Sequence, residues 1–399
     1  MRKATVAFIF ALVVMDVLAL GIVIPVLPKL VERFEGGNTA QAAEVFGVMS
    51  TAWGVAQFLA MPLLGMLSDR FGRRSVILVS CLGLGIDYFV MALAPTVAWL
   101  FAGRVVSGIT SANITTAFAY IADVTPAPKR AGAFGLMGAA FGVGFVLGPA
   151  LGGILGGIDP RLPFWVAGAF ALANAAYGFF VLPESLAPER RARFAWARAN
   201  PVGSLKLLRS HRELFGLAGV LLLMNLAHFS LPAIGVLYMS YRYGWSEVAV
   251  GLVLALVGVC AMIVQGGLVR RVVPKIGERR ALALGLLAGG VGFFMYGLAP
   301  TGALFLAAIP VMSIWGFAMP SAQALMTRHV SVSEQGQLQG ANASLTSITG
   351  IFAPALFTQT FAATLDRLPG AAFMLAGVML LVAMVLAWRV TRSEAQAAR

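Results

Sequence analysis

Charged residues are scarce in this sequence, and so are histidine and cysteine. Only 11 % of the 399 residues are charged, whereas soluble domains contain about 25 %. A soluble fold of this length would form two or three domains, each needing a charged surface that this chain does not supply. Cys81 and Cys260 both fall within apolar runs, so no disulfide framework is predicted. Three histidines without zinc-like spacing, and the lack of a phosphate-binding glycine loop, argue against a membrane-embedded enzyme.

Apolar residues are abundant instead. They make up 59 % of the chain, and the mean hydropathy is +0.87. Apolar runs of about 20 residues, long enough to cross a hydrocarbon core, occur twelve times. They cover about 5–27, 44–67, 75–95, 98–122, 132–157, 163–182, 213–240, 246–270, 281–299, 302–326, 337–361 and 371–390. Because lipid cannot satisfy an open backbone, each run is expected to be helical, which predicts an all-α integral membrane protein.

The net charge of +13 and the pI near 10.5 are explained by topology. With the N-terminus inside, most of the cations fall in the segments on the inner side of the membrane. The outer segments contain only Lys29, Arg33, Arg161, Arg242 and Arg367, and Arg104 alone lies within a span. This distribution follows the positive-inside rule and predicts that both termini are cytoplasmic. We therefore expect a multi-pass protein of the inner (plasma) membrane with no nucleic-acid partner.

The two halves of the chain repeat each other at an offset of 205 residues. The repeated pairs are "LAPT" at 93–96 and 298–301, "PAL" at 149–151 and 354–356, and "DRFGRR" from 69 with "PKIGER" from 274. This repeat predicts two pseudo-symmetric six-helix bundles, at 1–183 and 213–399. A basic cytoplasmic linker at 184–212, with an amphipathic helix around 194–199, would join them. Two such bundles can rock about a shared site and expose it to each side of the membrane in turn.

Several motifs match a known family. "GMLSDRFGRR" occupies 65–74, and Arg104 lies in "GRVVSGI". The run at 132–157 has the spacing G-x8-G-x3-G-P-x2-G-G, formed by Gly135, Gly144, Gly148, Pro149, Gly152 and Gly153. "MDVLALGIVIPVLP", "GIDYFVMA", "AYIADVTP" and "GQLQG" accompany these motifs. With them the chain resembles the major facilitator superfamily and, within it, the drug:proton antiporters of the tetracycline-resistance type.

The resemblance implies a fold, an activity and a set of partners. The fold is that of the major facilitators, and the activity is proton-coupled export of small amphiphilic drugs, tetracyclines included, by alternating access. The partners are the drug, the proton and the lipid bilayer, and the protein is expected to work as a monomer. No cofactor is expected, since a proton gradient drives transport and the drug can arrive as a metal chelate.

The motif at 65–74 is predicted to act as a cytoplasmic gate. Its residues, with one from the end of the fourth span, are Gly65, Asp69, Arg70, Gly72, Arg73, Arg74 and Asp123. By resemblance, Asp69 lies against a helix N-terminus of the other half, and Arg70 or Arg73 pairs with Asp123. In the simpler interpretation this loop is a tight turn whose cations only set the topology. The glycines of 132–157 are expected to allow close helix packing, and Pro149 is expected to bend or interrupt that helix.

Asp16 and Asp87 are the only acidic residues well inside the predicted spans. A charge at the bilayer centre costs about 2.5–3.5 kcal/mol on insertion scales, so these acids indicate function. At a helical rise of about 1.5 Å per residue, Asp16, Asp87 and Arg104 are expected to lie at similar depths below the outer ends of their spans. We expect a buried titratable cluster in which a proton and a cationic cargo compete for a carboxylate, which is antiport expressed as linkage. The alternative is an Asp–Arg pair that only fixes helix packing.

Polar and aromatic residues within the spans are candidates for the drug-binding pocket. They are Gln57, Tyr88, Asn113, Asn225, His228, Gln323 and Asn342. Hydrogen bonding between helices is the alternative role for each of them. The run at 281–299 has no ionisable residue within the membrane, and Cys260 stands where tetracycline exporters typically carry a histidine, so the cargo stays open. The alternative functions are an uptake symporter or facilitator for another small metabolite and a non-transporting receptor of this fold.

Overall fold

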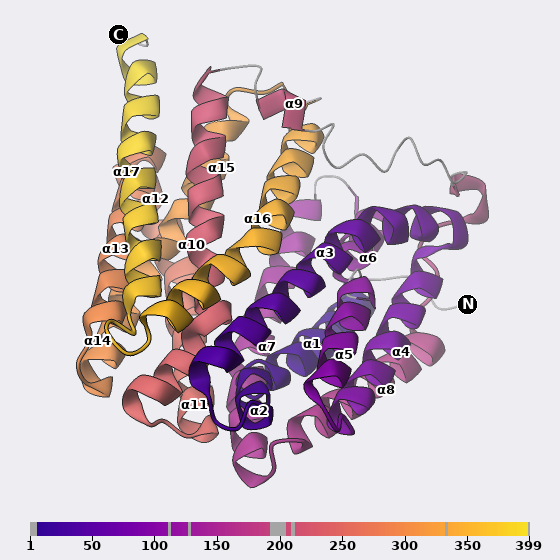
Figure 1. Ribbon diagram of the computed structural model, residues 1–399. Coiled ribbons are helices and arrows are strands. Elements are labelled where there is room, and N and C mark those ends of the chain that lie inside the picture. Colours follow the sequence, from indigo (N-terminus) through magenta and orange to yellow (C-terminus); the bar gives the residue numbers. More distant parts are fainter. Residues whose placement is uncertain are drawn as a thin grey trace. The chain divides into compact units, whose positions relative to one another are not determined.

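The structure is a computed structural model that describes residues 6–110, 113–126, 129–191, 205–208, 212–331 and 334–397. Within these residues every regular element is a helix, and no strand occurs. Figure 1 shows the helices in chain order. The prediction of an all-α protein is confirmed. The helix predicted around 194–199 lies outside the described residues.

The helices of the first half follow the predicted spans. They are α1 (Val6–Val23), α2 (Leu27–Phe34), α3 (Thr39–Phe71), α4 (Arg73–Ala92), α5 (Val97–Thr110), α6 (Asn113–Val124), α7 (Arg130–Ile158) and α8 (Leu162–Val181). A short 3₁₀ helix, η2 (Pro188–Arg190), follows them. α3 is longer than the apolar run at 44–67 because backbone hydrogen bonding continues into the polar flanks, where water replaces lipid.

The helices of the second half include two irregular segments. The elements are α9 (Leu205–Leu208), α10 (Arg212–Tyr243), α11 (Glu247–Met262), η4 (Ile263–Leu268), α12 (Val269–Ile276), α13 (Glu278–Leu298), α14 (Gly302–Ser313), η5 (Ile314–Phe317), α15 (Ala318–Thr327), α16 (Gln335–Thr364) and α17 (Ala371–Ala397). η4 is a π-helix and η5 a 3₁₀ helix, and the two pack against each other. The predicted spans 246–270 and 302–326 are therefore not uniform α-helices.

Eleven helical segments of the described residues are long and apolar enough to cross a membrane. The twelfth predicted span, 337–361, lies within α16, which has 30 residues but is not among the eleven. Its first half is too polar, because it contains Gln335, Gln337, Gln339, Asn342, Ser344 and Thr346. The cytoplasmic location of both termini stays a prediction.

The chain divides into two compact units. The first unit comprises Met1–Asn38, Ala52–Ala199 and Trp245–Ala255, and the second comprises Thr39–Thr51, Asn200–Gly244 and Leu256–Arg399. Each unit is thus built mainly from one half of the sequence and includes a short segment of the other half. The predicted boundaries of the two bundles, at 183 and 213, stay a prediction.

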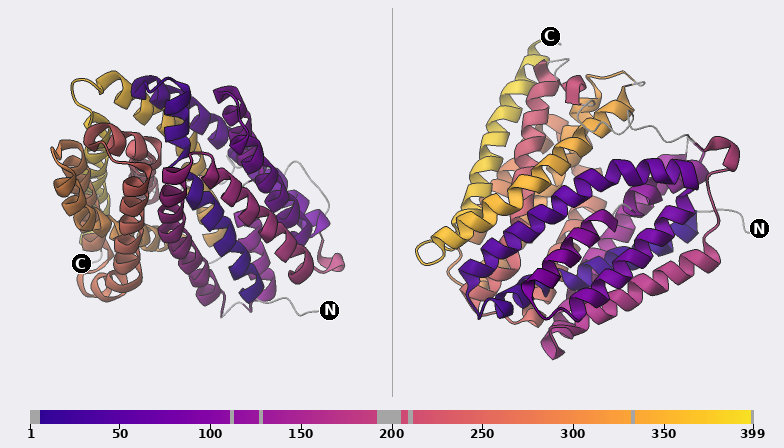
Figure 2. Two further views of the ribbon diagram at one scale, coloured as in Figure 1. Left: turned by 90° about the horizontal axis from the view of Figure 1, so that it is seen from below. Right: turned by 45° about the vertical axis from the view of Figure 1, so that its right-hand side comes forward.

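Each unit has its own helix packing. In the first unit α1 packs against α7 and α8, while α4 packs against α5, α6 and α8. In the second unit α10 packs against α16 and α17, and α13 packs against α14 and α17. The right-hand view of Figure 2 shows α17, in yellow, beside α10, in pink. Cys81 lies in the core of the first unit, and both cysteines are free thiols.

The internal repeat is present in the backbone as well as in the sequence. Gly72 begins α4 with φ +100°, and Gly277, which lies 205 residues further on, begins α13 with φ +79°. Both glycines adopt the left-handed region that L-residues with a side chain avoid. Pro149 and Pro354, the second repeated pair, lie inside α7 and α16. α7 continues through Pro149, so the helix is not interrupted there, and the expected bend stays a prediction.

Candidate functional site

Asp87 is a buried carboxyl group without a hydrogen-bond partner in the described part of the chain. It lies on α4, the side chain is 2 % exposed, and neither of its carboxylate oxygens has a hydrogen-bond partner. Gly103 on α5 leaves room for the carboxylate of Asp87, since a Cβ at Gly103 would lie only 2.8 Å from Asp87 Oδ1. A buried polar group that is not hydrogen-bonded is costly. Asp87 therefore differs from the acids of ordinary helix packing, which are paired or solvated.

Arg104 is the cation that acts on Asp87, but the two side chains form no direct ion pair. The guanidinium carbon of Arg104 lies over the Trp53 ring, 5.1 Å from its centroid, which is cation–π geometry. Its charge nevertheless acts on Asp87 and on Tyr88. The predicted alternative, a packed Asp–Arg pair, is therefore not what this structure has.

The charges of both acids, Asp16 and Asp87, act on Tyr88. It follows Asp87 on α4, is 4 % exposed, and interacts electrostatically with Asp16, Asp87 and Arg104. Asp16 on α1 is itself 8 % exposed. The charges of all three residues predicted to form one cluster thus act on one phenol. Tyr88, expected in the drug pocket, belongs to this acid cluster, which we define as Asp16, Asp87, Tyr88 and Arg104.

The predicted gate residues form an ion-pair network centred on Arg73. Its Nη1 lies 2.6 Å from Asp69 Oδ1, and its Nε lies 3.2 Å from Asp123 Oδ2. Arg73 thus bridges the end of α3 and the end of α6, and of the two predicted partners of Asp123 it is Arg73, not Arg70, that makes the contact. Arg70 lies over the neighbouring Phe71 ring instead, 5.1 Å from its centroid.

The remaining residues of the motif shape the turn between α3 and α4. Gly65 accepts a hydrogen bond from Ser68 Oγ through its carbonyl oxygen. Arg74 donates from Nη2 to the carbonyl oxygen of Phe179 on α8. These contacts all lie within the first unit, so the expectation that Asp69 meets a helix N-terminus of the other half stays a prediction.

Glu184, which the sequence did not single out, completes this network. Its Oε1 accepts hydrogen bonds from the backbone N–H of Arg73, Ser185 and Leu186 at 2.9–3.0 Å, and its Oε2 accepts from Arg74 N at 3.3 Å. A carboxylate at the N-terminus of α4 accepts hydrogen bonds from backbone N–H groups that have no partner within the helix, and it interacts favourably with the positive end of the helix dipole. Gly72 is required beside it, since a Cβ there would lie 2.2 Å from Glu184 Oε2.

The glycine motif of α7 packs α1 and α11 against two faces of one helix. Gly144, Gly148 and Gly152 face Val17, Gly21 and Ile22 of α1, with an added Cβ at each coming within 2.0–2.6 Å of an α1 atom. Gly153 faces α11, where the contact is Gly251. Gly135 lies in the first turns of the same helix. Their spacing by four residues places Gly144, Gly148 and Gly152 on one face of the helix. Close packing against α1 therefore explains this part of the glycine motif.

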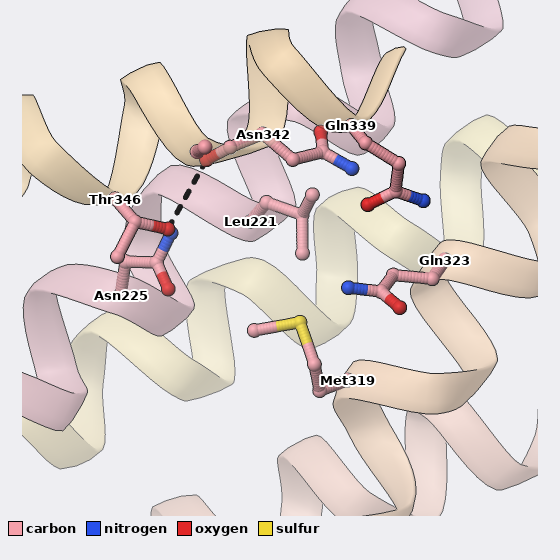
Figure 3. A pocket seen from close by; sticks show the side chains of 8 residues that line it. Leu221, Asn225, Met319, Gln323, Gln339, Asn342 and Thr346 are labelled. Carbon is pink, nitrogen blue, oxygen red and sulfur yellow. Dashed lines mark hydrogen bonds between the residues drawn. The ribbon is translucent and has the colours of Figure 1, made fainter. Parts of the chain in front are cut away.

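A polar pocket in the second unit brings together three of the predicted pocket residues. Asn225 on α10, Gln323 on α15 and Asn342 on α16 line a cavity of about 230 Å³ (Figure 3). The other residues that line it are Leu221, Met319, Gln339, Ala343 and Thr346. Asn225 Nδ2 donates to Thr346 Oγ1 at 3.0 Å. We call this cavity the amide pocket.

The other predicted pocket residues lie elsewhere. Gln57 is on α3, and His228 is on α10, where its ring packs against Trp315 in a tilted arrangement with 5.7 Å between the ring centroids. Asn113 is the first residue of α6, but its side chain lies outside the described part. Gln339 and Thr346 were missed, although their spacing of three and four residues from Asn342 would have placed them on its face of the helix.

Comparison with known proteins identifies the family. The model of the Major Facilitator Superfamily matches residues 9–354 and 271–399. The chain belongs to the Major Facilitator Superfamily. It is therefore a transporter rather than an enzyme, and a multi-pass protein of the inner membrane.

Named relatives narrow this position within the superfamily. The class C tetracycline resistance protein of Escherichia coli is 37 % identical over 374 residues, which is 94 % of each chain. Multidrug resistance protein 2 of Bacillus subtilis (strain 168) is 26 % identical and covers 95 % of this chain and 94 % of its own. Among solved structures, the human organic anion transporter MFSD10 superposes with a TM-score of 0.72 at 25 % identity, covering 96 % of this chain and 98 % of that one.

Proposed function

We propose that this major facilitator exports small amphiphilic drugs, tetracyclines among them, in exchange for protons. The relatives that match nearly the whole chain are tetracycline and multidrug resistance proteins by name, which favours removal of a drug from the cell over uptake of a nutrient. We expect the protein to act as a monomer with no cofactor, and the drug to be able to enter as a metal chelate.

The observation that carries the proposal is the unpaired carboxyl group of Asp87. Both oxygens are buried without a donor, and Arg104 lies on Trp53 rather than in an ion pair with it. Because a buried carboxylate without partners is costly, proton uptake and release at Asp87 alter the local free energy. The cluster can thereby favour different conformations of the protein in its protonated and ionised states, which is what proton coupling requires.

The exchange step needs no covalent chemistry. A proton enters Asp87 from the side of higher acidity, and a cationic or chelated drug competes with that proton for the same carboxylate. Each ligand lowers the affinity for the other by the same factor. For one proton exchanged, a pH difference of one unit supplies about 1.4 kcal/mol and supports about tenfold accumulation of the drug.

Replacing Asp87 with Asn tests the proposal. In proteoliposomes that contain the purified full-length protein, an imposed pH gradient drives accumulation of tetracycline by the unchanged protein. Asp87→Asn is expected to lose this accumulation, because an uncharged amide can neither exchange the proton nor attract a cationic drug. Asp366→Asn, which changes an exposed carboxyl group in the turn after α16, is the control and should accumulate normally. Undiminished accumulation by Asp87→Asn would remove this residue from the coupling.

A further inference from the structure

The amide pocket is polar but uncharged. Four carboxamide side chains and one hydroxyl group line it, those of Asn225, Gln323, Gln339, Asn342 and Thr346, and none of the described residues that line it is ionisable. Polar residues in membrane-spanning helices are expensive and usually serve a function. In α16 they recur at positions 339, 342 and 346, which is one face of the helix. The pocket is therefore built by a continuous polar stripe and not by isolated substitutions.

Asn342 has no hydrogen-bond partner among the residues that the structure describes. It is 8 % exposed, and neither its Oδ1 nor its Nδ2 atom makes a hydrogen bond. Asn225 differs, because its Nδ2 is occupied by Thr346. Figure 3 shows Gln323 and Gln339 on the two sides of the space beside Asn342. An unpaired buried amide costs free energy that a bound ligand with both donors and acceptors can recover.

Size and charge limit what this ligand can be. The cavity of about 230 Å³ is smaller than the 300–1,000 Å³ or so that holds a whole drug, so it fits one edge of a larger molecule. A carboxylate or an ammonium group would be buried there without a counter-charge, which is unfavourable. Carboxamides, ketones and hydroxyl groups match amide side chains without that cost.

We infer that the amide pocket binds the uncharged, hydrogen-bonding edge of the cargo, a carboxamide flanked by keto or hydroxyl groups. This inference rests on the proposed function and divides its tasks. The acid cluster of the first unit couples the cargo to the proton, and Asn342, Gln323 and Gln339 of the second unit recognise the cargo by neutral hydrogen bonds.

Tetracycline is the probe, because its ring system carries a carboxamide beside keto and hydroxyl groups. Its affinity for the purified full-length protein is measured by fluorescence titration. Asn342→Leu and Gln339→Leu are each expected to weaken binding about five- to tenfold, the effect of losing one hydrogen bond. Gln337→Leu is the matched control, since Gln337 lies on the same helix, is exposed like Gln339, and does not line the pocket.

The outcomes separate the inference from the proposed function. If Asn342→Leu and Gln339→Leu bind tetracycline as tightly as Gln337→Leu does, the inference is wrong, whatever Asp87→Asn does. If both bind more weakly while Asp87→Asn still accumulates drug under a pH gradient, the pocket is supported and proton coupling through Asp87 fails. Gln339→Leu changes an exposed side chain and should fold normally, so a folding defect of the buried Asn342 variant leaves the test intact.

Discussion

The close approach of α1 and α7 gives a quantitative prediction for Gly148→Ala. A Cβ at Gly148 would lie 2.6 Å from the Cα atom and 2.9 Å from the carbonyl carbon of Gly21, about 1 Å inside ordinary carbon–carbon contact. These are backbone atoms that cannot rotate away, so α1 must move. Overpacking of this kind costs about 1–3 kcal/mol. At about 2–4 °C per kcal/mol for a unit of roughly 200 residues, the midpoint of thermal unfolding should fall by about 2–12 °C.

Gly138→Ala is the control for this prediction. It makes the same substitution in the same helix, but a Cβ at Gly138 has no atom within 4 Å. Because alanine favours a helix more than glycine does, Gly138→Ala should unfold at the same or a slightly higher temperature. Thermal unfolding of both variants in detergent, followed by far-UV circular dichroism, makes the comparison. Equal midpoints for the two variants would refute the claim that α7 needs glycine to approach α1.

The same substitution should also affect transport. Asp16 lies on α1, five residues before Gly21, so a displaced α1 moves one acid of the cluster relative to α4. Proximity effects in binding depend on geometry at the level of about 1 Å. The packing motif and the acid cluster are thus mechanically connected through a single helix.

Two further predictions concern charged side chains of the first unit. Glu184→Ala removes four hydrogen bonds to backbone N–H groups and should cost about 1–2 kcal/mol of stability, measured as a lower unfolding midpoint. Glu189→Ala, at an exposed position of η2, is the control and should leave the midpoint unchanged. Equal midpoints for the two variants would contradict the capping role of Glu184. The Arg33–Glu247 ion pair is 2.8 Å long, and the Arg33 side chain is 51 % exposed, so the pair should contribute less than about 1 kcal/mol of stability. Arg33→Gln is therefore expected to unfold near the wild-type midpoint in low and in high salt. A large, salt-dependent fall of the unfolding midpoint would disprove this.

The Arg73 network shows how a sequence motif and its surroundings combine. The motif predicted that Arg73 or Arg70 would meet Asp123, and the structure has the first of these contacts at 3.2 Å. Ser185 Oγ donates to the same Asp123 oxygen at 3.0 Å. The segment that begins with Glu184 and Ser185 is therefore held at the turn between α3 and α4, and movement of either the segment or the turn must break hydrogen bonds to charged groups.

The helical character of this protein and the buried charges of its candidate site could be predicted from the residue types. Lipid forbids unpaired backbone, so twelve apolar runs could only be helices. Asp16, Asp87 and Arg104 were predictable because charge in an apolar run is costly and therefore conspicuous. The repeat of "DRFGRR" as "PKIGER" aligned Gly72 with Gly277, although their positive φ became known only from the backbone.

Tertiary structure alone decided which side chains have partners. Nothing in the composition of α4 and α5 says that Arg104 lies on Trp53 instead of pairing with Asp87, because that choice depends on how α3 approaches α5. The amide pocket also needed three helices, α10, α15 and α16, that are distant in the sequence. Glu184 escaped notice for the same reason, since its partners are backbone N–H groups that become available only where α4 begins. Partner choice depends on distance in space, which a linear pattern of residue types does not contain.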